Sequence, residues 1–493
     1  MTAERLSTLD ASFLRLESRT AHMHVGWRGV FAVPAPRKRP TLSRLKETVA
    51  GRLRFAPRCR QRLIFAPAGL GEPYWVDDED FHLDFHVRRL GDPYLPPSPA
   101  RFGELCDQVL SRPLDRRRPL WEIHIAPKLA DGRVGLVMKM HHAMVDGISA
   151  VQLALLVFSD RADDDAQLPD EWTPRRAPGS AGLALRAIGD SAAESLRAAR
   201  GVAELATSPL SGTTRLAGTL RRTALAVGDD LLRAAPSAYV NREIGPARTL
   251  ICHRWSLSEL LQIKQRTQTT HNDVCLALVT GALRRLGGER DDSTATMKAM
   301  IPVSRRASER SGALGNRISF AFIDLPVGRS SPTAWLHSVH EQTQAFKRSE
   351  RAAGTESLLS ALRFTPAPIK TYAARLAASA RTYNLTVSNV PGPRTPIYML
   401  GAELQEAYPV VPLSDQHALS VGIFTYREGV HLGLYVDPEA LPEATALPMV
   451  LRESARALNR ATLSAARVSH DAGVPHRRVA RRSRSADVVR LQP

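Results

Sequence analysis

The sequence contains few cysteines and no long apolar run. Its four cysteines, Cys59, Cys106, Cys252 and Cys275, are scattered over 493 residues without pairing or metal-ligand spacing. We therefore expect reduced, mostly buried thiols. No window reaches the roughly eighteen uninterrupted apolar residues that a membrane-spanning helix needs. The first residues, Met-Thr-Ala-Glu-Arg, do not resemble a secretory signal, and we expect a cytoplasmic protein.

Acidic residues are also in short supply. The chain has 49 aspartates and glutamates against 67 lysines and arginines, a net charge of +18. This balance favours anionic partners such as nucleic acid, acidic lipid surfaces or the phosphates of coenzyme A. Zinc-finger spacing, an aromatic RNA-binding motif and a clear helix-turn-helix pattern are missing, so we expect no nucleic-acid partner. The apolar content of 43% is typical of a globular protein, and the length predicts two domains.

The most informative segment is residues 139–149. It contains His141 and His142, followed by Asp146 and Gly147. Apolar runs before and after it predict a strand, a tight turn at Asp146-Gly147 and a buried helix. A histidine at such a strand end can face a cleft. There an imidazole, which titrates near neutrality, can take the proton from a hydroxyl or thiol that attacks a carbonyl.

Other roles for these residues remain open. If strand alternation continues through His142, its side chain shares the core face with Leu136, Met138 and Met140. Asp146 could bond a ring nitrogen, or pair with a buried arginine that holds the turn in shape. Metal binding is disfavoured, because adjacent histidines on a strand point to opposite faces and no partner lies at zinc-ligand spacing.

The pattern His-His-x-x-x-Asp-Gly resembles the signature of the CoA-dependent acyltransferase superfamily, which includes chloramphenicol acetyltransferase and peptide-synthetase condensation domains. Several other segments, in the same order along roughly residues 6–460, resemble the bacterial wax ester synthase/diacylglycerol acyltransferase family. They are Leu6–Phe13 with Met23–Gly26, Pro113–Glu122, Asn272–Val274 and Ser388–Pro393. The family usually has glycines near Asp415-Gln416-His417, and this chain departs from it there.

The resemblance implies an α/β fold. Two chloramphenicol-acetyltransferase-like domains would form a pseudo-dimer with a central channel and His142 near its middle. The expected divisions are a first domain with the histidine motif at 1–160, a helical crossover at 161–245, a second domain at 246–465 and a disordered basic tail at 466–493.

The resemblance also implies a function. The chain is expected to transfer a long-chain fatty acyl group from acyl-CoA to diacylglycerol, with acyl-CoA as co-substrate and neither a metal nor another cofactor. His142 would be the general base, His141 would support it, and Asp146 and Gly147 would orient the motif. The residues that bind CoA are not identified.

Three polar residues are candidate oxyanion donors: Asn272, Ser388 and Asn389. Asn272 follows Thr270 at an expected helix start, so helix capping is the interpretation that we favour for its segment.

Alternatives to a diacylglycerol acyltransferase are a wax ester synthase that uses a long-chain alcohol, a condensation-type enzyme that uses a carrier-protein thioester, and a non-catalytic lipid-surface protein. Arginines in the crossover, such as Arg186, Arg197, Arg221 and Arg222, could rest on an anionic membrane or lipid droplet. A solvated helix face is the more ordinary role for such residues. The basic tail could add attraction to lipid headgroups.

Overall fold

The structure is a computed structural model. It describes residues 3–34, 39–144, 153–154, 156–162, 172–207, 233–288, 295–304, 318–348 and 367–472. Several sequence predictions therefore lie outside the described residues. These are the roles of Asp146 and Gly147, the helical character of 208–232 with Arg221 and Arg222, and the tail from residue 473 onwards.

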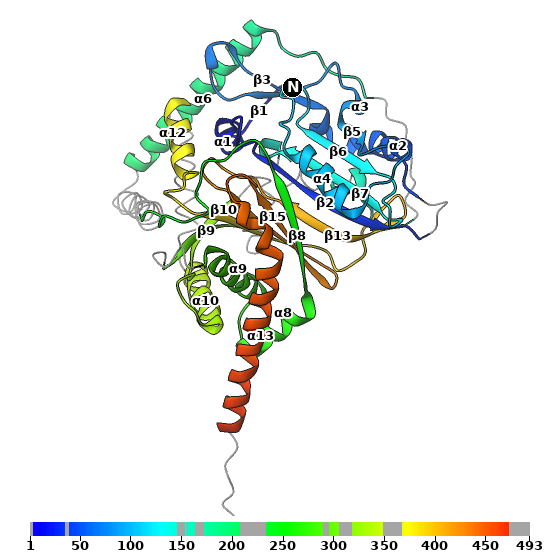
Figure 1. Ribbon diagram of the computed structural model, residues 1–493. Coiled ribbons are helices and arrows are strands. Elements are labelled where there is room, and N and C mark those ends of the chain that lie inside the picture. Colours follow the sequence, from blue (N-terminus) through cyan, green and yellow to red (C-terminus); the bar gives the residue numbers. More distant parts are fainter. Residues whose placement is uncertain are drawn as a thin grey trace, which may run out of the picture.

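The first sheet contains the strand that ends at the histidine pair. Its six strands lie in the order β12-β13-β2-β7-β6-β5 (Figure 1). Their bounds are Tyr398–Met399, Ala402–Val410, His24–Ala32, Val134–His141, Trp121–Ala126 and Val87–Arg89. Strands β6 and β7 form a hairpin, in which they pair antiparallel with Trp121 opposite Met140. The connecting turn includes Gly132 at φ +85°, a backbone conformation that glycine adopts without steric cost.

The second sheet is formed by the C-terminal half of the chain. Its order is β10-β9-β11-β14-β15-β8, with β11 parallel to both β9 and β14. The bounds are Ile318–Leu325, Met297–Ser304, Leu385–Pro391, Leu419–Tyr426, Gly429–Val436 and Thr249–Ser256. Four helices pack together beside this sheet (Figure 1): α8 Leu257–Thr267, α9 His271–Gly287, α10 Pro332–Arg348 and α13 Leu447–Ala472.

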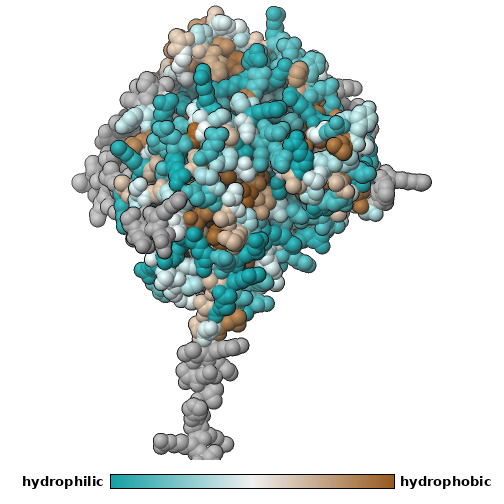
Figure 2. Space-filling view, viewed as in Figure 1, coloured by the Kyte–Doolittle hydropathy of each residue, from teal (hydrophilic) through white to brown (hydrophobic). Residues whose placement is uncertain are grey.

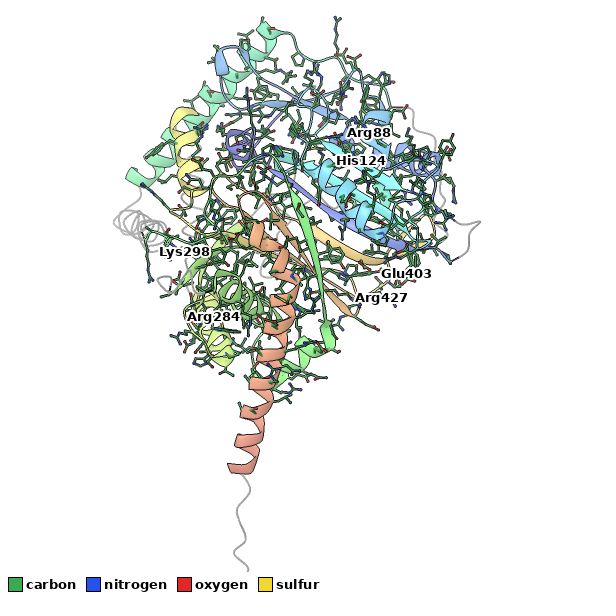
Figure 3. All side chains as sticks on the ribbon, viewed as in Figure 1. Arg88, His124, Arg284, Lys298, Glu403 and Arg427 are labelled. Atoms are coloured by element: carbon green, nitrogen blue, oxygen red, sulfur yellow. The ribbon has the colours of Figure 1, made fainter. Side chains whose placement is uncertain are left out.

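Two strands of the C-terminal half, β12 and β13, belong to the first sheet. Both strands fall within the expected second domain, 246–465, yet they extend the first sheet, where β13 pairs antiparallel with β2. Ion pairs hold β13 from two directions. Arg133 contacts Glu406 at 2.9 Å, and Arg427 from the β14–β15 turn contacts Glu403 (Figure 3). The boundary expected at residue 246 therefore does not separate two independent sheets.

The crossover contains one long described helix, α6 (Ser180–Thr207). Leu183 and Ala187 of α6 pack with Tyr74 on a small sheet of order β1-β4-β3, which spans Glu4–Arg5, Tyr74–Asp77 and Gln61–Ile64. The Tyr74 hydroxyl also donates to Asp190 at 2.7 Å. The predicted helix in this part of the crossover is therefore confirmed and is anchored on the N-terminal half.

Helix starts follow the capping residues in the sequence. Ser7 caps α1 (Thr8–Leu16) and Thr41 caps α2 (Leu42–Arg52), each side chain accepting a hydrogen bond from a backbone N–H of the first turn. The disordered tail expected from residue 466 is wrong over its first residues, because α13 continues to Ala472. Two alanines and one arginine, which are strong helix formers, lie among the last seven residues of α13.

Within the described residues, no helix is both long enough and apolar enough to cross a membrane. The face shown in Figure 2 is mostly hydrophilic and is interrupted by apolar patches.

Candidate active site

The histidine pair lies where β7 ends. All eight residues of β7 are buried, and its last residue is His141. His142 begins a short 3-10 turn, η5 (His142–Met144), and its backbone N–H donates to the carbonyl of Met23 at 2.8 Å. Because the strand geometry stops at His141, the alternation that would have turned His142 towards the core does not apply. His142 is partly exposed, whereas Ala143 and Met144 beside it are buried.

His142 is held as a neutral ring. Its imidazole stacks on Phe13 of α1, with ring centroids 3.7 Å apart and 18° between the planes. Burial lowers the pKa of His142 to about 4; a hydrogen bond to its own backbone opposes this shift and the neighbouring His141 adds to it. At neutral pH the ring therefore carries a free lone pair, which is the form that a general base requires.

His141 is buried and has a contact for each ring nitrogen. Its Nδ1 accepts a hydrogen bond from the backbone N–H of Ala143 at 3.0 Å, which leaves the ring proton on Nε2. Nε2 lies 3.4 Å from a carboxylate oxygen of Glu17. Glu17 also accepts from Nε of Arg116 at 2.6 Å. Burial alone would raise the pKa of Glu17, but His141 and Arg116 outweigh it and lower this pKa, so the carboxylate stays charged.

A second row of buried polar groups shares this face of the sheet. His24 of β2 lies directly opposite His141, with 6.5 Å between ring centroids, and His22 lies 5.4 Å from His24. Burial, together with Lys139 and His141, holds the pKa of His24 well below its usual value. Within the described part of the chain, neither ring nitrogen of His24 has a hydrogen-bond partner.

Lys139 is the cation of this row. Its ammonium donates to the carbonyls of Val109 at 2.8 Å and Arg112 at 2.6 Å, and burial lowers its pKa to about 8. Sequence reasoning missed His22 and His24 as neighbours of the motif and gave Lys139 no role. The Met23-His24 pair was noticed only as part of a resemblance, and its place opposite His141 follows from strand register.

The candidate oxyanion residues meet on the second sheet. The Asn389 amide of β11 donates to the Asn272 side-chain oxygen at 3.1 Å, so the structure brings these two residues together. Ser388 precedes Asn389 and is also partly exposed. Among the described residues, no hydrogen bond joins this group to His142. Capping is carried by the neighbours of Asn272, because Thr270 and Asp273 form a capping box.

Asp273 is further fixed by two residues of α10. His340 contacts its carboxylate at 2.7 Å, and the Thr343 hydroxyl donates to it at 2.7 Å. Asp273 is therefore a structural residue, whereas the Asn272 side chain takes no part in the capping box and bonds to Asn389.

The segment in which this chain lacks the family's glycines adopts an unusual backbone. Gln416 has φ +65°, a conformation that glycine adopts more easily. The preceding Asp415 accepts hydrogen bonds from the hydroxyls of Ser18 at 3.1 Å and Thr20 at 3.2 Å. The loop thus ties the C-terminal half to the segment that follows α1.

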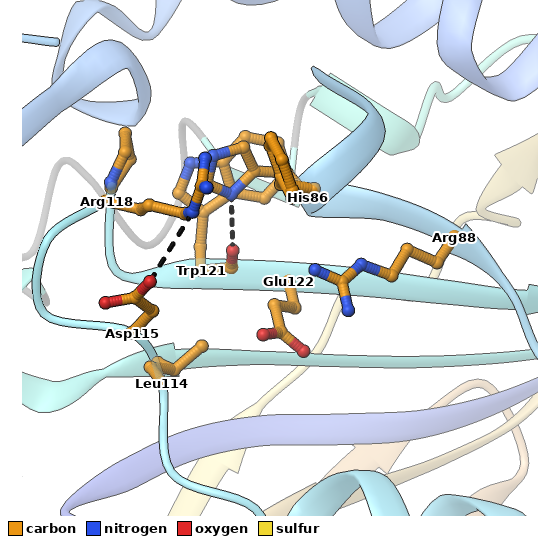
Figure 4. A pocket seen from close by; sticks show the side chains of 9 residues that line it. His86, Arg88, Leu114, Asp115, Arg118, Trp121 and Glu122 are labelled. Atoms are coloured by element: carbon orange, nitrogen blue, oxygen red, sulfur yellow. Dashed lines mark hydrogen bonds and ion pairs between the residues drawn. The ribbon is translucent and has the colours of Figure 1, made fainter. Parts of the chain in front are cut away.

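A cavity of about 240 Å³ lies beside the N-terminal end of β6 (Figure 4). Its lining includes His86, whose Nδ1 donates to the Trp121 carbonyl at 2.8 Å, and Arg118, which lies 3.5 Å from Asp115. His142 is not part of this lining. Across the described ranges, no group of three or more His, Cys, Asp or Glu side chains is arranged to hold a metal ion.

The chain matches two family models: the wax ester synthase/diacylglycerol acyltransferase catalytic domain over residues 6–275 and the C-terminal domain of the same family over 314–459. Two probable diacylglycerol O-acyltransferases of Mycobacterium tuberculosis are similar to it. One, tgs2, is 32% identical, and the alignment covers 92% of this chain and 98% of tgs2. The other, tgs1, is 31% identical, and the alignment covers 89% of this chain and 92% of tgs1.

Solved structures agree with this match. A wax ester synthase/diacylglycerol acyltransferase from Marinobacter aquaeolei VT8 superposes with a TM-score of 0.65 at 25% identity, covering 94% of this chain and all of that one. The first condensation domain of the calcium-dependent antibiotic synthetase superposes with a TM-score of 0.59 at 17% identity, covering 93% of this chain and 96% of that domain. This similarity shows a shared fold. The expected chloramphenicol-acetyltransferase-like α/β fold is therefore confirmed. The chain is an acyltransferase that belongs to the wax ester synthase/diacylglycerol acyltransferase family.

Proposed function

We propose that this protein transfers a long-chain fatty acyl group from acyl-CoA to the free hydroxyl of diacylglycerol, with His142 as the general base. The observation that carries the proposal is the state of His142, a neutral and partly exposed imidazole at the end of a buried strand. Family membership supplies the class of reaction. The chemistry uses acyl-CoA as co-substrate and assigns no step to a metal or another cofactor.

In the proposed reaction, His142 removes the proton from the acceptor hydroxyl as its oxygen attacks the thioester carbonyl. The tetrahedral intermediate then collapses, the carbon–sulfur bond breaks, and the imidazolium returns the proton to the thiolate of coenzyme A. General-base assistance of this kind contributes about 10²- to 10⁴-fold in rate. His141 is a poor candidate for the same role, because its Nδ1 is occupied by the Ala143 N–H.

The oxyanion of the intermediate needs hydrogen-bond donors. Asn389 uses one amide proton on Asn272, which leaves its second amide proton and both amide protons of Asn272 free of that bond. The Ser388 hydroxyl is next to them. We assign oxyanion stabilisation to this group; loss of one such donor typically costs about 10²- to 10³-fold in kcat. Asp146 and Gly147 keep their assigned role in orienting the motif.

Diacylglycerol is the preferred acceptor because the mycobacterial relatives are named diacylglycerol O-acyltransferases. The name of the Marinobacter enzyme includes wax ester synthase, which supports a long-chain alcohol as the second candidate. A carrier-protein thioester as acyl donor is supported only by the fold shared with condensation domains. Membership of an acyltransferase family leaves a non-catalytic role without support.

The protein is proposed to act at a lipid surface, either the inner membrane or a lipid droplet. Leu183 and Ala187 of α6 face the small sheet, whereas Leu185, Ile188 and Leu196 lie on the opposite side of the helix and are exposed. An apolar patch at the top of Figure 2 lies where α6 begins in Figure 1. An apolar row on a surface helix is typical of helices that lie in a membrane interface.

Helix α12 (Ala367–Ala377) also exposes apolar side chains and is part of the proposed lipid-binding face. Its Tyr372 and Leu376 are exposed, and Arg186 and Arg375 are exposed beside the two apolar rows. Arginines at this position would attract anionic headgroups. Because α12 packs against α1, which contacts η5, a lipid docked here would lie near the element that carries His142.

The experiment offers radiolabelled palmitoyl-CoA to the purified full chain, with diacylglycerol and hexadecanol in separate reactions. We expect labelled triacylglycerol from the native protein and a loss of at least about 100-fold in His142→Ala. His337→Ala, an exposed histidine on α10, is the matched control and should retain full activity.

Three other results of these assays would change the proposal. Wax ester in place of triacylglycerol would replace diacylglycerol by an alcohol as the acceptor. Transfer from a palmitoyl-carrier-protein thioester but not from palmitoyl-CoA would establish the condensation-type donor. Full activity in His142→Ala would rule out His142 as the base.

A further inference from the structure

Helix α1 and its C-cap residue Glu17 contact both histidines of the motif through two side chains four residues apart. Phe13 stacks on His142, and the Glu17 carboxylate lies 3.4 Å from Nε2 of His141. The Glu17 backbone N–H donates to the Phe13 carbonyl at 3.0 Å, which closes the last turn of α1 and places the two side chains on one side of it. His141 and His142 point in different directions, yet α1 fixes each of them.

The contact with Glu17 determines how the proton is placed on His141. Because Nδ1 accepts from the Ala143 N–H at 3.0 Å, the ring proton is on Nε2, which lies 3.4 Å from a Glu17 carboxylate oxygen in an ion-pair contact without hydrogen-bond geometry. This arrangement fixes the orientation of the ring. The backbone of Ala143 belongs to the same turn as His142, so the position of the His141 ring and the start of η5 depend on each other.

Glu17 is itself held by residues far away in the sequence. Arg116 donates to the Glu17 carboxylate through Nε at 2.6 Å and to the Leu14 carbonyl at 3.1 Å. On another side of α1, Arg15 pairs with the buried carboxylate of Glu72. Anchored at both places, α1 cannot turn away from the histidines without breaking charged contacts. Arg116 lies inside the Pro113–Glu122 segment, and this gives that loop a role next to the motif.

We infer that Glu17 is a positioning residue for the proton transfer, acting through His141 to hold the turn that carries His142, with Arg116 keeping its carboxylate in place. This inference rests on the proposed function of His142. Glu17 does not touch the substrate in this account. Its removal should therefore lower kcat and leave the KM for palmitoyl-CoA and for the acceptor nearly unchanged.

The first test is Glu17→Gln in the full chain, assayed beside the native protein. Gln keeps the size and an acceptor oxygen but loses the charge. We expect kcat to fall about 10- to 100-fold, as small misplacements of a catalytic group do, with KM within about twofold. Glu104→Gln is the matched control, because Glu104 is an exposed residue of α4 (Pro99–Leu110) paired only with Arg101 among the described residues.

A double-mutant cycle asks whether Glu17 acts through His141. In His141→Asn, the asparagine amide oxygen can take the place of Nδ1 and accept from the Ala143 N–H. Asparagine has no atom in the place of Nε2, so the contact with Glu17 is lost. If Glu17 acts through His141, Glu17→Gln combined with His141→Asn should be no slower than the slower single variant. A general loss of structure would instead give effects that multiply, and the proposal would be overturned.

Arg116→Gln keeps the inference testable if Glu17→Gln does not fold. Arg116 is partly exposed, with 41% of its side-chain surface accessible, so its replacement should be tolerated, and it frees the Glu17 carboxylate from one side. We expect a smaller loss of kcat, about 3- to 10-fold, again without a change in KM. If Glu17→Gln and Arg116→Gln fold and retain kcat within twofold of the native value, the positioning role is refuted. A native protein that transfers no acyl group would refute the proposed function instead, before any variant is compared.

Discussion

The ring of Phe13 lies stacked on the ring of His142, with 3.7 Å between centroids and 18° between planes. Phe13 therefore covers one face of the imidazole and restricts its rotation, while the ring edge stays available to accept a proton. Burial against this ring is also part of the reason that the pKa of His142 is low.

Phe13→Leu should test this stacking. Leucine keeps an apolar side chain on α1 but has no flat ring, so His142 gains rotational freedom. We expect kcat to fall about 3- to 30-fold while the protein stays folded. Phe55→Leu, at an exposed phenylalanine, should leave kcat unchanged. Unchanged turnover in Phe13→Leu would mean that the stacking has no role in orienting the base.

The pH dependence of kcat/KM should reveal the lowered pKa of His142. The reactive form is the neutral ring, which is present above its pKa and lost as pH falls through it. With a pKa of about 4, activity should stay level from pH 8 down to about pH 5 and decrease below that. Steady-state rates on palmitoyl-CoA in overlapping buffers would measure this. An acid limb centred near 6.5 would indicate an unperturbed histidine.

Gln416→Gly should stabilise the protein. Gln416 has φ +65°, where a residue with a Cβ is strained and glycine is not, and the hydrogen bond from Asn241 goes to its backbone carbonyl, which glycine retains. We expect an increase of about 0.5–1 kcal/mol in the free energy of unfolding, measured by urea titration. Gln416→Ala keeps the strain and should show no gain; equal effects of both changes would rule out backbone strain as the cause.

The exposed row on α6 should carry binding to lipid. Leu185→Ser together with Ile188→Ser should reduce co-sedimentation with vesicles that contain phosphatidylglycerol, because each serine removes apolar area that would enter the interface. A loss of about tenfold or more in the partition coefficient is expected. Met449→Ser, at an exposed methionine of α13, is the control. Equal binding by the native protein and the double variant would remove α6 from the proposed docking face.

The local elements follow from short-range interactions along the chain. Ser7, Thr41 and Thr270 precede helices because their side chains accept from backbone N–H groups of the first turn, an interaction that spans only a few residues. The β6–β7 hairpin follows in the same way from two apolar runs joined by a short turn with Gly132. The histidine motif could therefore be placed at a strand end before any tertiary contact was known.

The surroundings of that motif depend on contacts between segments far apart in the chain. His24 lies opposite His141 because β2 and β7 pair in one particular register, and β13 extends the first sheet although it belongs to the second half of the chain. The contacts of Phe13 and Glu17 with the histidines likewise join residues more than a hundred positions apart. Local propensities carry no information on strand order, register or helix docking, because these are set by which apolar faces bury together in the complete fold.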